Sequence, residues 1–85
     1  MSTELRLPRL GETMEEGIVV TWNLTEGESF ERGNTLLEVE TDKMVAEVPA
    51  LENGILLEIL VEEQAKVKVG DILAIIDPLD KSSKR

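Results

Sequence analysis

The chain has 85 residues, which suits one domain with a small core, and it contains neither cysteine nor histidine. Disulfides and thiolate metal sites are therefore excluded, and the most common general base and metal ligand is missing. Eighteen acidic against nine basic residues give a formal net charge of −9, which argues against nucleic acids and anionic membranes as partners. Apolar residues make up 41% of the chain and aromatic residues only 2%, so the core has to consist of Val, Ile and Leu.

The hydropathy of the chain bears on its compartment. No segment has the roughly 18 continuous apolar residues of a membrane span, and the first residues lack the apolar core of a signal peptide. We therefore expect a cytoplasmic protein, or a protein of the mitochondrial matrix if its source is eukaryotic. No serine is placed beside a base, and no residue set suggests a metal site, so we expect no catalysis from the chain itself.

The distribution of β-branched and turn residues predicts an all-β fold. Residues 4–7 alternate and predict a first strand that Pro8 ends, and residues 10–17 predict a loop. No window keeps a helical period for three turns. Residues 1–78 are assigned to the domain, and the polar, basic residues 79–85 to the start of a flexible linker or disordered tail. Further strands are predicted at residues 18–22, at Phe30, and at residues 36–41, 44–48, 55–61, 67–69 and 72–76.

The stretch from residue 37 to residue 48 is predicted to form a hairpin with a two-residue turn at Asp42 and Lys43. Because side chains alternate along strands, this turn gathers the apolar side chains on one face and the glutamates, with Val45, on the other. A one-residue shift would mix the two faces, so this register is favoured and Lys43 stands at the tip. The predicted pairs are Leu37 with Val48, Glu38 with Glu47, Val39 with Ala46, Glu40 with Val45 and Thr41 with Met44.

Two halves of the chain share the same order of glycines, predicted strands and turns, and corresponding residues lie 37 positions apart. Neither half can cover its own apolar face, so we expect the halves to pack around a pseudo-two-fold axis. The offset relates, among others, Gly17 to Gly54, Trp22 to Ile59, Phe30 to Val67, Gly33 to Gly70 and Leu36 to Leu73. We expect core positions for Trp22, Phe30, Ile59 and Val67, and positive φ in the turns at Gly33 and Gly70.

The repeat also predicts where the lysine lies relative to the chain ends. Under the same offset Lys43 corresponds to Arg6 in one direction and to Asp80 in the other. Where one half has the hairpin tip, the other half therefore has the two ends of the chain. We therefore expect Lys43 at one pole and both termini near the opposite pole, an arrangement that suits a tethered carrier.

From about Leu5 to Ile76 the chain resembles the lipoyl domains of the dihydrolipoyl acyltransferase components of 2-oxo acid dehydrogenase complexes. The centre of this resemblance is the motif Glu-Thr-Asp-Lys at residues 40–43, within the longer match Glu38 to Lys43. The other matching motifs are Pro8-x-Leu10-Gly11-Glu12, Glu16-Gly17, Trp22, Glu26-Gly27-Glu28, Gly33-Asn34-x-Leu36, Glu47-Val48, Gly54 and Val69-Gly70.

This resemblance implies a fold, a cofactor and a set of partners. The fold is a flattened barrel, or barrel-sandwich hybrid, of two four-stranded antiparallel sheets, and lipoic acid is carried in amide linkage on Lys43. The implied function is that of a swinging arm, which shuttles acyl groups and electrons between the active sites of a 2-oxo acid dehydrogenase complex, or of a related one such as that for acetoin. The implied partners are a lipoate ligase or lipoyl transferase, a thiamine-diphosphate-dependent decarboxylase and dihydrolipoyl dehydrogenase. We expect a monomeric carrier that is no enzyme itself but belongs to a dihydrolipoyllysine-residue acyltransferase.

Several residues near Lys43 are candidates for recognition by the ligase or the decarboxylase. Asp42 and Glu40 flank the lysine on the hairpin, although Asp42 also suits a structural role in the turn and Glu40 that of a solvated surface residue. By the resemblance, the loop from Leu10 to Glu16 lies beside the lysine, which adds Glu12, Thr13 and Met14. Structural turns are assigned to Gly17, Gly33, Gly54 and Gly70.

Met44 is a departure from the family pattern. Lipoyl domains most often have alanine after the lysine, whereas biotin carrier domains of the same fold have methionine on both sides of it. Met44 therefore keeps a biotin carboxyl carrier open as an alternative and bears mainly on which ligase would act. A further interpretation is an unmodified barrel-sandwich adaptor, in which Lys43 is an ordinary solvated lysine.

Overall fold

The computed structural model describes residues 2–11 and 14–79, and this part of the chain folds into strands, turns and loops without a helix. In chain order the strands are β1 (Thr3–Arg6), β2 (Glu16–Trp22), β3 (Ser29–Phe30), β4 (Thr35–Glu40), β5 (Val45–Pro49), β6 (Gly54–Ile59), β7 (Lys66–Lys68) and β8 (Ile72–Pro78). Every predicted strand is present, with ends within two residues of the prediction, and the all-β prediction is confirmed. The described chain thus holds no helix of the length and hydropathy that crossing a membrane requires.

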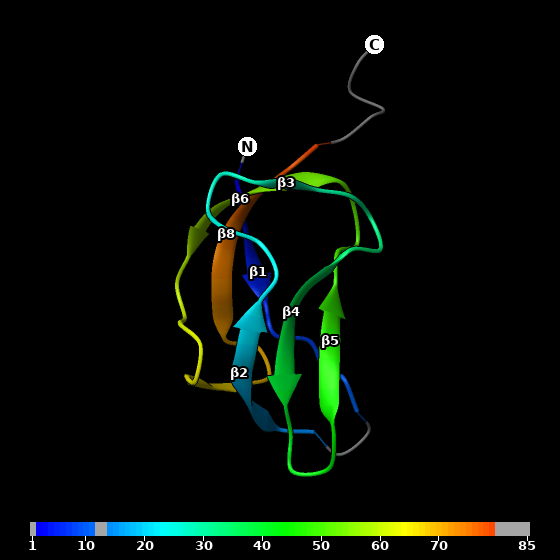
Figure 1. Cartoon of the computed structure of the whole chain (residues 1–85), viewed down its shortest axis with the longest axis vertical. Helices are drawn as coiled ribbons and strands as arrows, with labels where there is room; N and C mark the ends of the chain where they lie inside the picture. Colours follow the sequence, from blue (N-terminus) through cyan, green and yellow to red (C-terminus); the bar gives the residue numbers. More distant parts are fainter. Residues whose placement is uncertain (1, 12–13, 80–85) are drawn as a thin grey trace.

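The described strands form two four-stranded antiparallel sheets that face each other across the core (Figure 1). One sheet has the order β1-β8-β6-β3 and the other the order β5-β4-β2-β7. Among the described residues none that is polar or charged is buried, so the fold depends on aliphatic packing. The barrel-sandwich fold that the resemblance implied is confirmed. The most completely buried side chains are Leu7, Val19, Leu37, Val39, Val48, Leu56, Val67 and Leu73.

The two halves of the repeat interlock and do not form one sheet each. Strand β3 of the first half pairs with β6 of the second, and β7 of the second half pairs with β2 of the first. Each sheet therefore contains strands of both halves, which is how each half covers the apolar face of the other. The two halves also form corresponding backbone hydrogen bonds. The N–H of Gly27 donates to the carbonyl oxygen of Leu56 at 2.6 Å, and the N–H of Gln64 donates to that of Val19 at 2.7 Å.

The glycines that were assigned to turns fall into two kinds. Gly33 and Gly70 precede β4 and β8 with φ of +93° and +96°, a conformation that side chains rarely adopt. Gly17 and Gly54 lie inside β2 and at the start of β6, so their assignment to turns is wrong. A Cβ at Gly17 would lie 2.9 Å from the carbonyl oxygen of Glu40, and the backbone opposite Gly54 is nearly as close. These two positions require glycine because the neighbouring strand leaves no room for a side chain.

The four side chains expected in the core differ in burial. Phe30 and Val67 are buried, whereas Trp22 and Ile59 are partly buried and pack against the core from its edge. The indole Nε1 of Trp22 donates to the carbonyl oxygen of Val61 at 2.9 Å. This hydrogen bond holds one end of the indole at the edge of the core, where its polar group has a partner.

Strand β1 occupies the place in its sheet that β5 occupies in the other sheet. Thr3 pairs with Ile76 of β8, and Ala46 pairs with Val39 of β4, the residue 37 positions before Ile76. Thr3 therefore corresponds to Ala46, which relates β1 to β5 by an offset of 43 residues. The predicted correspondence of Lys43 with Arg6 is therefore wrong. The offset is 37 residues for β4 and β8 but 43 for β1 and β5, because a turn joins β4 to β5 whereas β8 and β1 are the two ends of the chain. The prediction of opposite poles does hold. In Figure 1 the β4–β5 hairpin points down, whereas β1 begins and β8 ends at the top.

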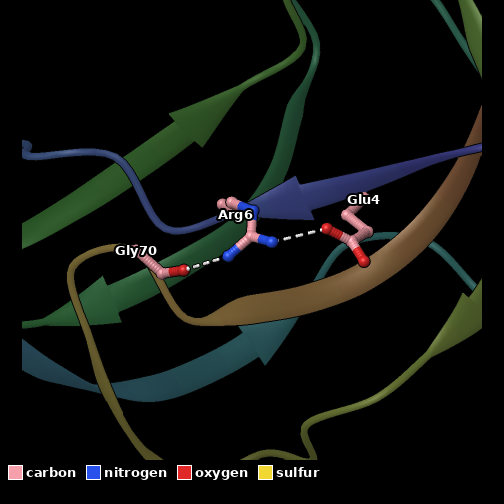
Figure 2. A network of polar contacts seen from close by, with 3 residues as sticks. All are labelled: Glu4, Arg6 and Gly70. Carbon is pink, nitrogen blue, oxygen red and sulfur yellow. Dashed lines mark hydrogen bonds and ion pairs between the residues drawn. The ribbon is translucent and has the colours of Figure 1, made fainter.

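Arg6 anchors the end of β1 (Figure 2). Its Nη1 donates to the carbonyl oxygen of Gly70 at 2.8 Å, and its Nη2 donates to Oε1 of Glu4 at 2.6 Å. The next residue, Leu7, donates its N–H to the carbonyl oxygen of Asp71 at 2.9 Å. These contacts fix the point at which the chain leaves β1 and enters the loop that leads to Met14.

At the other end of the described chain, the N–H of Leu79 donates to the carbonyl oxygen of Asn53 at 2.7 Å. Leu79 is thus attached to the barrel. The remainder of the segment assigned to a linker, residues 80–85, lies outside the described residues.

Candidate functional site

The hairpin of β4 and β5 has the predicted register. Leu37 pairs with Val48, Glu38 with Glu47, Val39 with Ala46, and Glu40 with Val45. The inward-facing members of these pairs are at most 6% exposed, whereas Glu40, Val45 and Glu47 are exposed. A one-residue slip would expose the apolar set and bury carboxylates, so the register fixes where the hairpin tip, residues 41–44, is placed.

Thr41 holds the turn together. Its N–H donates to the carbonyl oxygen of Met44 at 2.7 Å, which closes the two-residue turn at Asp42 and Lys43. Its hydroxyl accepts the N–H groups of Met44 at 3.1 Å and Lys43 at 3.3 Å, and it donates to the carbonyl oxygen of Met44 at 3.0 Å. The sequence pattern predicted for Thr41 only that it pairs with Met44 across the turn. The signal for this role was available, since threonine side chains commonly bond to backbone groups two or three residues away.

Lys43 is exposed at the end of this rigid turn. Its ammonium forms no ion pair with a described residue. Both neighbours in the turn, Asp42 and Met44, are also exposed, Met44 to 52%. A primary amine in this position is open to an acyl-transferring enzyme.

One side of the hairpin tip is strongly acidic. Here a wide hollow of about 630 Å³, the acidic hollow, lies between the tip and the start of β2. Lys66 offsets part of the charge through an ion pair with Glu16 at 3.4 Å. Glu40 and Asp42, two of the predicted recognition residues, lie on this side. The lining residues are Glu15, Glu16, Gly17, Ile18, Glu40, Thr41, Asp42 and Lys66.

The other side of the hairpin tip is largely apolar. A groove of about 150 Å³, the tip groove, separates it from the loop after β1, so the loop lies beside the lysine as expected. Lys43 itself lines this groove. The complete lining is Leu10, Gly11, Met14, Thr41, Asp42, Lys43, Met44 and Ala46.

The loop residues proposed for recognition do not share one role. Met14 is only 6% exposed and belongs to the hydrophobic core, so the expectation that it is presented to a partner is wrong. Its apolar side chain is pulled inward at the point where the loop returns to β2. Glu12 and Thr13 lie outside the described residues. The side chain that does stand out at the tip is Met44, together with Asp42 and Lys43.

Fold and site together define a class of protein. It is a small, rigid β barrel that presents one lysine at a hairpin tip, with no other reactive side chain among the described residues of the tip. The barrel fixes the position of the amine, and the surface around the amine is acidic on one side and apolar on the other. Such a domain is built to carry a covalently attached group.

Comparison with known proteins agrees with this class. The family model described as biotin-requiring enzyme matches residues 3–76. The chain is 40% identical over 80 residues to the dihydrolipoyllysine-residue acetyltransferase components of pyruvate dehydrogenase complexes from Staphylococcus aureus and Staphylococcus epidermidis. These matches cover 94% of the chain but only 19% and 18% of the two relatives, so the chain spans about a fifth of their length.

Solved structures similar to the barrel include a lipoyl domain and a domain of a carboxylase. The lipoyl domain of the 2-oxoglutarate dehydrogenase complex from Azotobacter vinelandii is 33% identical, with a TM-score of 0.69 and coverage of 86% of this chain and 92% of that domain. A single-chain, multi-domain long-chain acyl-CoA carboxylase matches with a TM-score of 0.78 at 23% identity, over 95% of this chain and 7% of the carboxylase. The carboxylase shows the fold alone. The chain therefore belongs to the family of biotinyl and lipoyl attachment domains, as the motif around Lys43 indicated.

Proposed function

We propose that this domain carries lipoic acid in amide linkage on Lys43 and shuttles acyl groups and electrons within a 2-oxo acid dehydrogenase complex. The observation that carries the proposal is the position of Lys43, an exposed lysine at the tip of a hairpin of fixed register. The family match and the likeness to a lipoyl domain at 33% identity support the same assignment.

The residues of the hairpin tip fit an amide-linked arm. Thr41 keeps the turn closed, so the backbone that carries the amine has a fixed place at the tip. The amine, once deprotonated, displaces the leaving group of an activated lipoyl donor, which forms one amide bond and removes the positive charge. No buried carboxylate is left without a partner by this loss of charge, because no described charged residue is buried. The bound group would supply a disulfide that takes up an acyl group together with two electrons.

The proposal asks for recognition by three kinds of partner. A lipoate ligase or lipoyl transferase has to recognise the hairpin tip. A thiamine-diphosphate-dependent decarboxylase and dihydrolipoyl dehydrogenase have to bind the lipoylated domain so that its arm enters their active sites. Asp42 and Glu40 are exposed within this region and Met44 projects beside the lysine. Tethering raises the concentration of the arm at successive active sites, so that intermediates stay bound to the domain.

A biotin carrier is the second candidate, because Met44 stands directly after the lysine and is 52% exposed. A lysine between two methionines is the pattern of biotin carriers, and here Asp42 occupies the other side. The carboxylate is the feature that favours lipoylation. Replacement of Asp42 by methionine should therefore move Lys43 toward modification by biotin ligase.

Intact mass separates these candidates directly. The domain is co-expressed with lipoate ligase and lipoate, or with biotin ligase and biotin, beside the Lys43→Arg variant as control. We expect the lipoyl mass increment on the parent protein and no increment on Lys43→Arg. The modified domain is then offered to several decarboxylases with their 2-oxo acids, and the acylated mass identifies the partner. A parent protein left unchanged by lipoate ligase, but labelled by biotin ligase, would overturn the proposal.

A further inference from the structure

The tip groove is more apolar than attachment of a group to Lys43 requires. Leu10, Met14, Met44 and Ala46 supply most of its walls. Met14 and Ala46 are each 6% exposed and form the floor, whereas Met44 forms the rim at 52% exposure. Met44 thus adds apolar surface that the core does not use. On the basis of the proposed function, we infer that the tip groove is a docking site for the arm on Lys43, which alternates between a docked and an extended position.

The size of the tip groove suits the reactive end of the arm. Its volume is about 150 Å³, and an apolar cavity of about this volume holds one benzene ring. A five-membered dithiolane ring with its neighbouring methylenes is a group of that size. Two of the four apolar walls are methionines, whose polarizable sulfur and flexible side chain adapt to irregular apolar ligands.

The charge distribution selects this side of the hairpin. The acidic hollow on the other side is lined by the carboxylates of Glu15, Glu16, Glu40 and Asp42. An uncharged arm that entered it would displace water from these carboxylates without offering a hydrogen bond in return. Lys43 lines the tip groove but not the acidic hollow. Of the two hollows beside the hairpin tip, the tip groove is therefore the one that is both largely apolar and in contact with the attachment point.

The tip groove exists before any arm arrives. Nη1 of Arg9 donates to the carbonyl oxygen of Met14 at 2.7 Å, and the N–H of Leu10 points to the sulfur of Met14 at 3.3 Å. The opposite wall is held by the bonds of Thr41 in the turn. Because hydrogen bonds within the protein hold both walls, docking requires little further loss of conformational freedom at Met14 and in the turn.

Attachment makes even weak docking effective. A short flexible tether gives a local concentration on the order of millimolar. An intrinsic dissociation constant of about 1 mM therefore leaves about half of the arms docked. At this occupancy a partner enzyme still finds an extended arm in half of the molecules. The docked half is shielded from small-molecule reagents in solution.

The test uses methionine methyl groups as reporters. The chain has three methionines, of which Met14 and Met44 line the tip groove. Lipoyl-lysine is placed at position 43 by semisynthesis, so the result does not depend on any ligase. Acetyl-lysine at position 43 is the control, since it removes the same charge without the long arm. We expect ¹³C-methyl signals of Met14 and Met44 to differ between the two proteins, with nuclear Overhauser contacts between arm methylenes and the Met44 methyl.

A matched pair of variants adds a reactivity readout. Met44→Gln removes the rim of the groove, whereas Val45→Gln changes a neighbour of similar exposure, 53%, that does not line it. If half of the arms are docked, Met44→Gln should raise the rate at which a small phosphine reduces the dithiolane about twofold, and Val45→Gln should not. Identical methyl spectra of the lipoyl and acetyl proteins, or equal reduction rates in all three lipoyl proteins, would overturn the inference. Neither result touches the proposed function, which stands or falls with ligase-dependent modification of Lys43.

Discussion

The turn that presents Lys43 should depend on a single hydroxyl group, that of Thr41. In Thr41→Val the shape and the preference for a strand are nearly kept, but the hydroxyl is lost. That hydroxyl takes part in three hydrogen bonds, from the N–H groups of Lys43 and Met44 and to the carbonyl oxygen of Met44. A typical net contribution is about 0.5–1.5 kcal/mol for each bond, and water replaces part of it at an exposed tip. We therefore expect Thr41→Val to lower the free energy of unfolding by about 1–2 kcal/mol.

This loss is measurable by thermal unfolding. For a domain of 60–100 residues, 1 kcal/mol corresponds to about 4–8 °C in Tm, so the expected decrease is about 4–16 °C. Amide hydrogen exchange should accelerate at Lys43 and Met44, whose N–H groups lose their acceptor. If the ligase requires the closed turn, kcat/KM for lipoylation should fall about 5–30-fold, the factor that corresponds to 1–2 kcal/mol.

Thr41→Ser is the control, because it keeps the hydroxyl and loses only a methyl group. We expect its Tm and its exchange rates at the tip to stay close to those of the parent. The reasoning is refuted if Thr41→Val unfolds within about 0.5 kcal/mol of the parent, the range of a neutral surface substitution. It is also refuted if serine and valine destabilise the domain equally, because the effect would then come from the methyl group or the strand.

Three further predictions concern other parts of the chain. Gln64 has φ of +78° at a position where the other half of the repeat has glycine, so Gln64→Gly should stabilise the domain by about 0.5–1 kcal/mol in chemical denaturation, and Gln64→Ala should not. Gly17→Ala should cost about 1–3 kcal/mol, because its Cβ would lie 2.4 Å from Cγ1 of Val39; Gly11→Ala, with 3.9 Å to the nearest atom, should change the Tm little. Lys43→Arg should leave the free energy of unfolding within about 0.5 kcal/mol of the parent, since the exposed lysine has no ion pair with a described residue, and a larger change in urea denaturation would contradict that assignment.

The register of the hairpin was predictable because alternation along two strands admits one solution. Shifting the turn by one residue would bury glutamates in place of Val39 and Ala46, which are 0% and 6% exposed in the structure. The same argument located Lys43 at the tip. Local pattern was sufficient here because both strands have one buried and one exposed face over their whole length.

Alternation along a strand does not predict burial correctly where the strand contains a β-bulge. The register of β4 against β5 shifts between Thr35 and Leu37, and as a result Leu36 and Leu37 are both buried, at 2% and 0% exposure. Strict alternation would have placed Leu36 on the outer face. Met14 escaped prediction for a related reason. A loop has no periodicity from which burial can be read, so its inward turn depends on contacts with distant strands.

The interlocked repeat explains why attachment site and chain ends are separated. Strands β4 and β5 are joined by a turn at one pole, and their counterparts β8 and β1 are not joined at the other (Figure 1). Any chain that continues past β8 therefore leaves from the pole opposite Lys43. An arm on Lys43 can then enter the active site of a partner without the chain beyond β8 standing in the way. The separation of Lys43 from the chain ends depends on the register of β4 and β5 and on the pairing of β1 with β8. It would therefore persist even if the surface around the lysine changed.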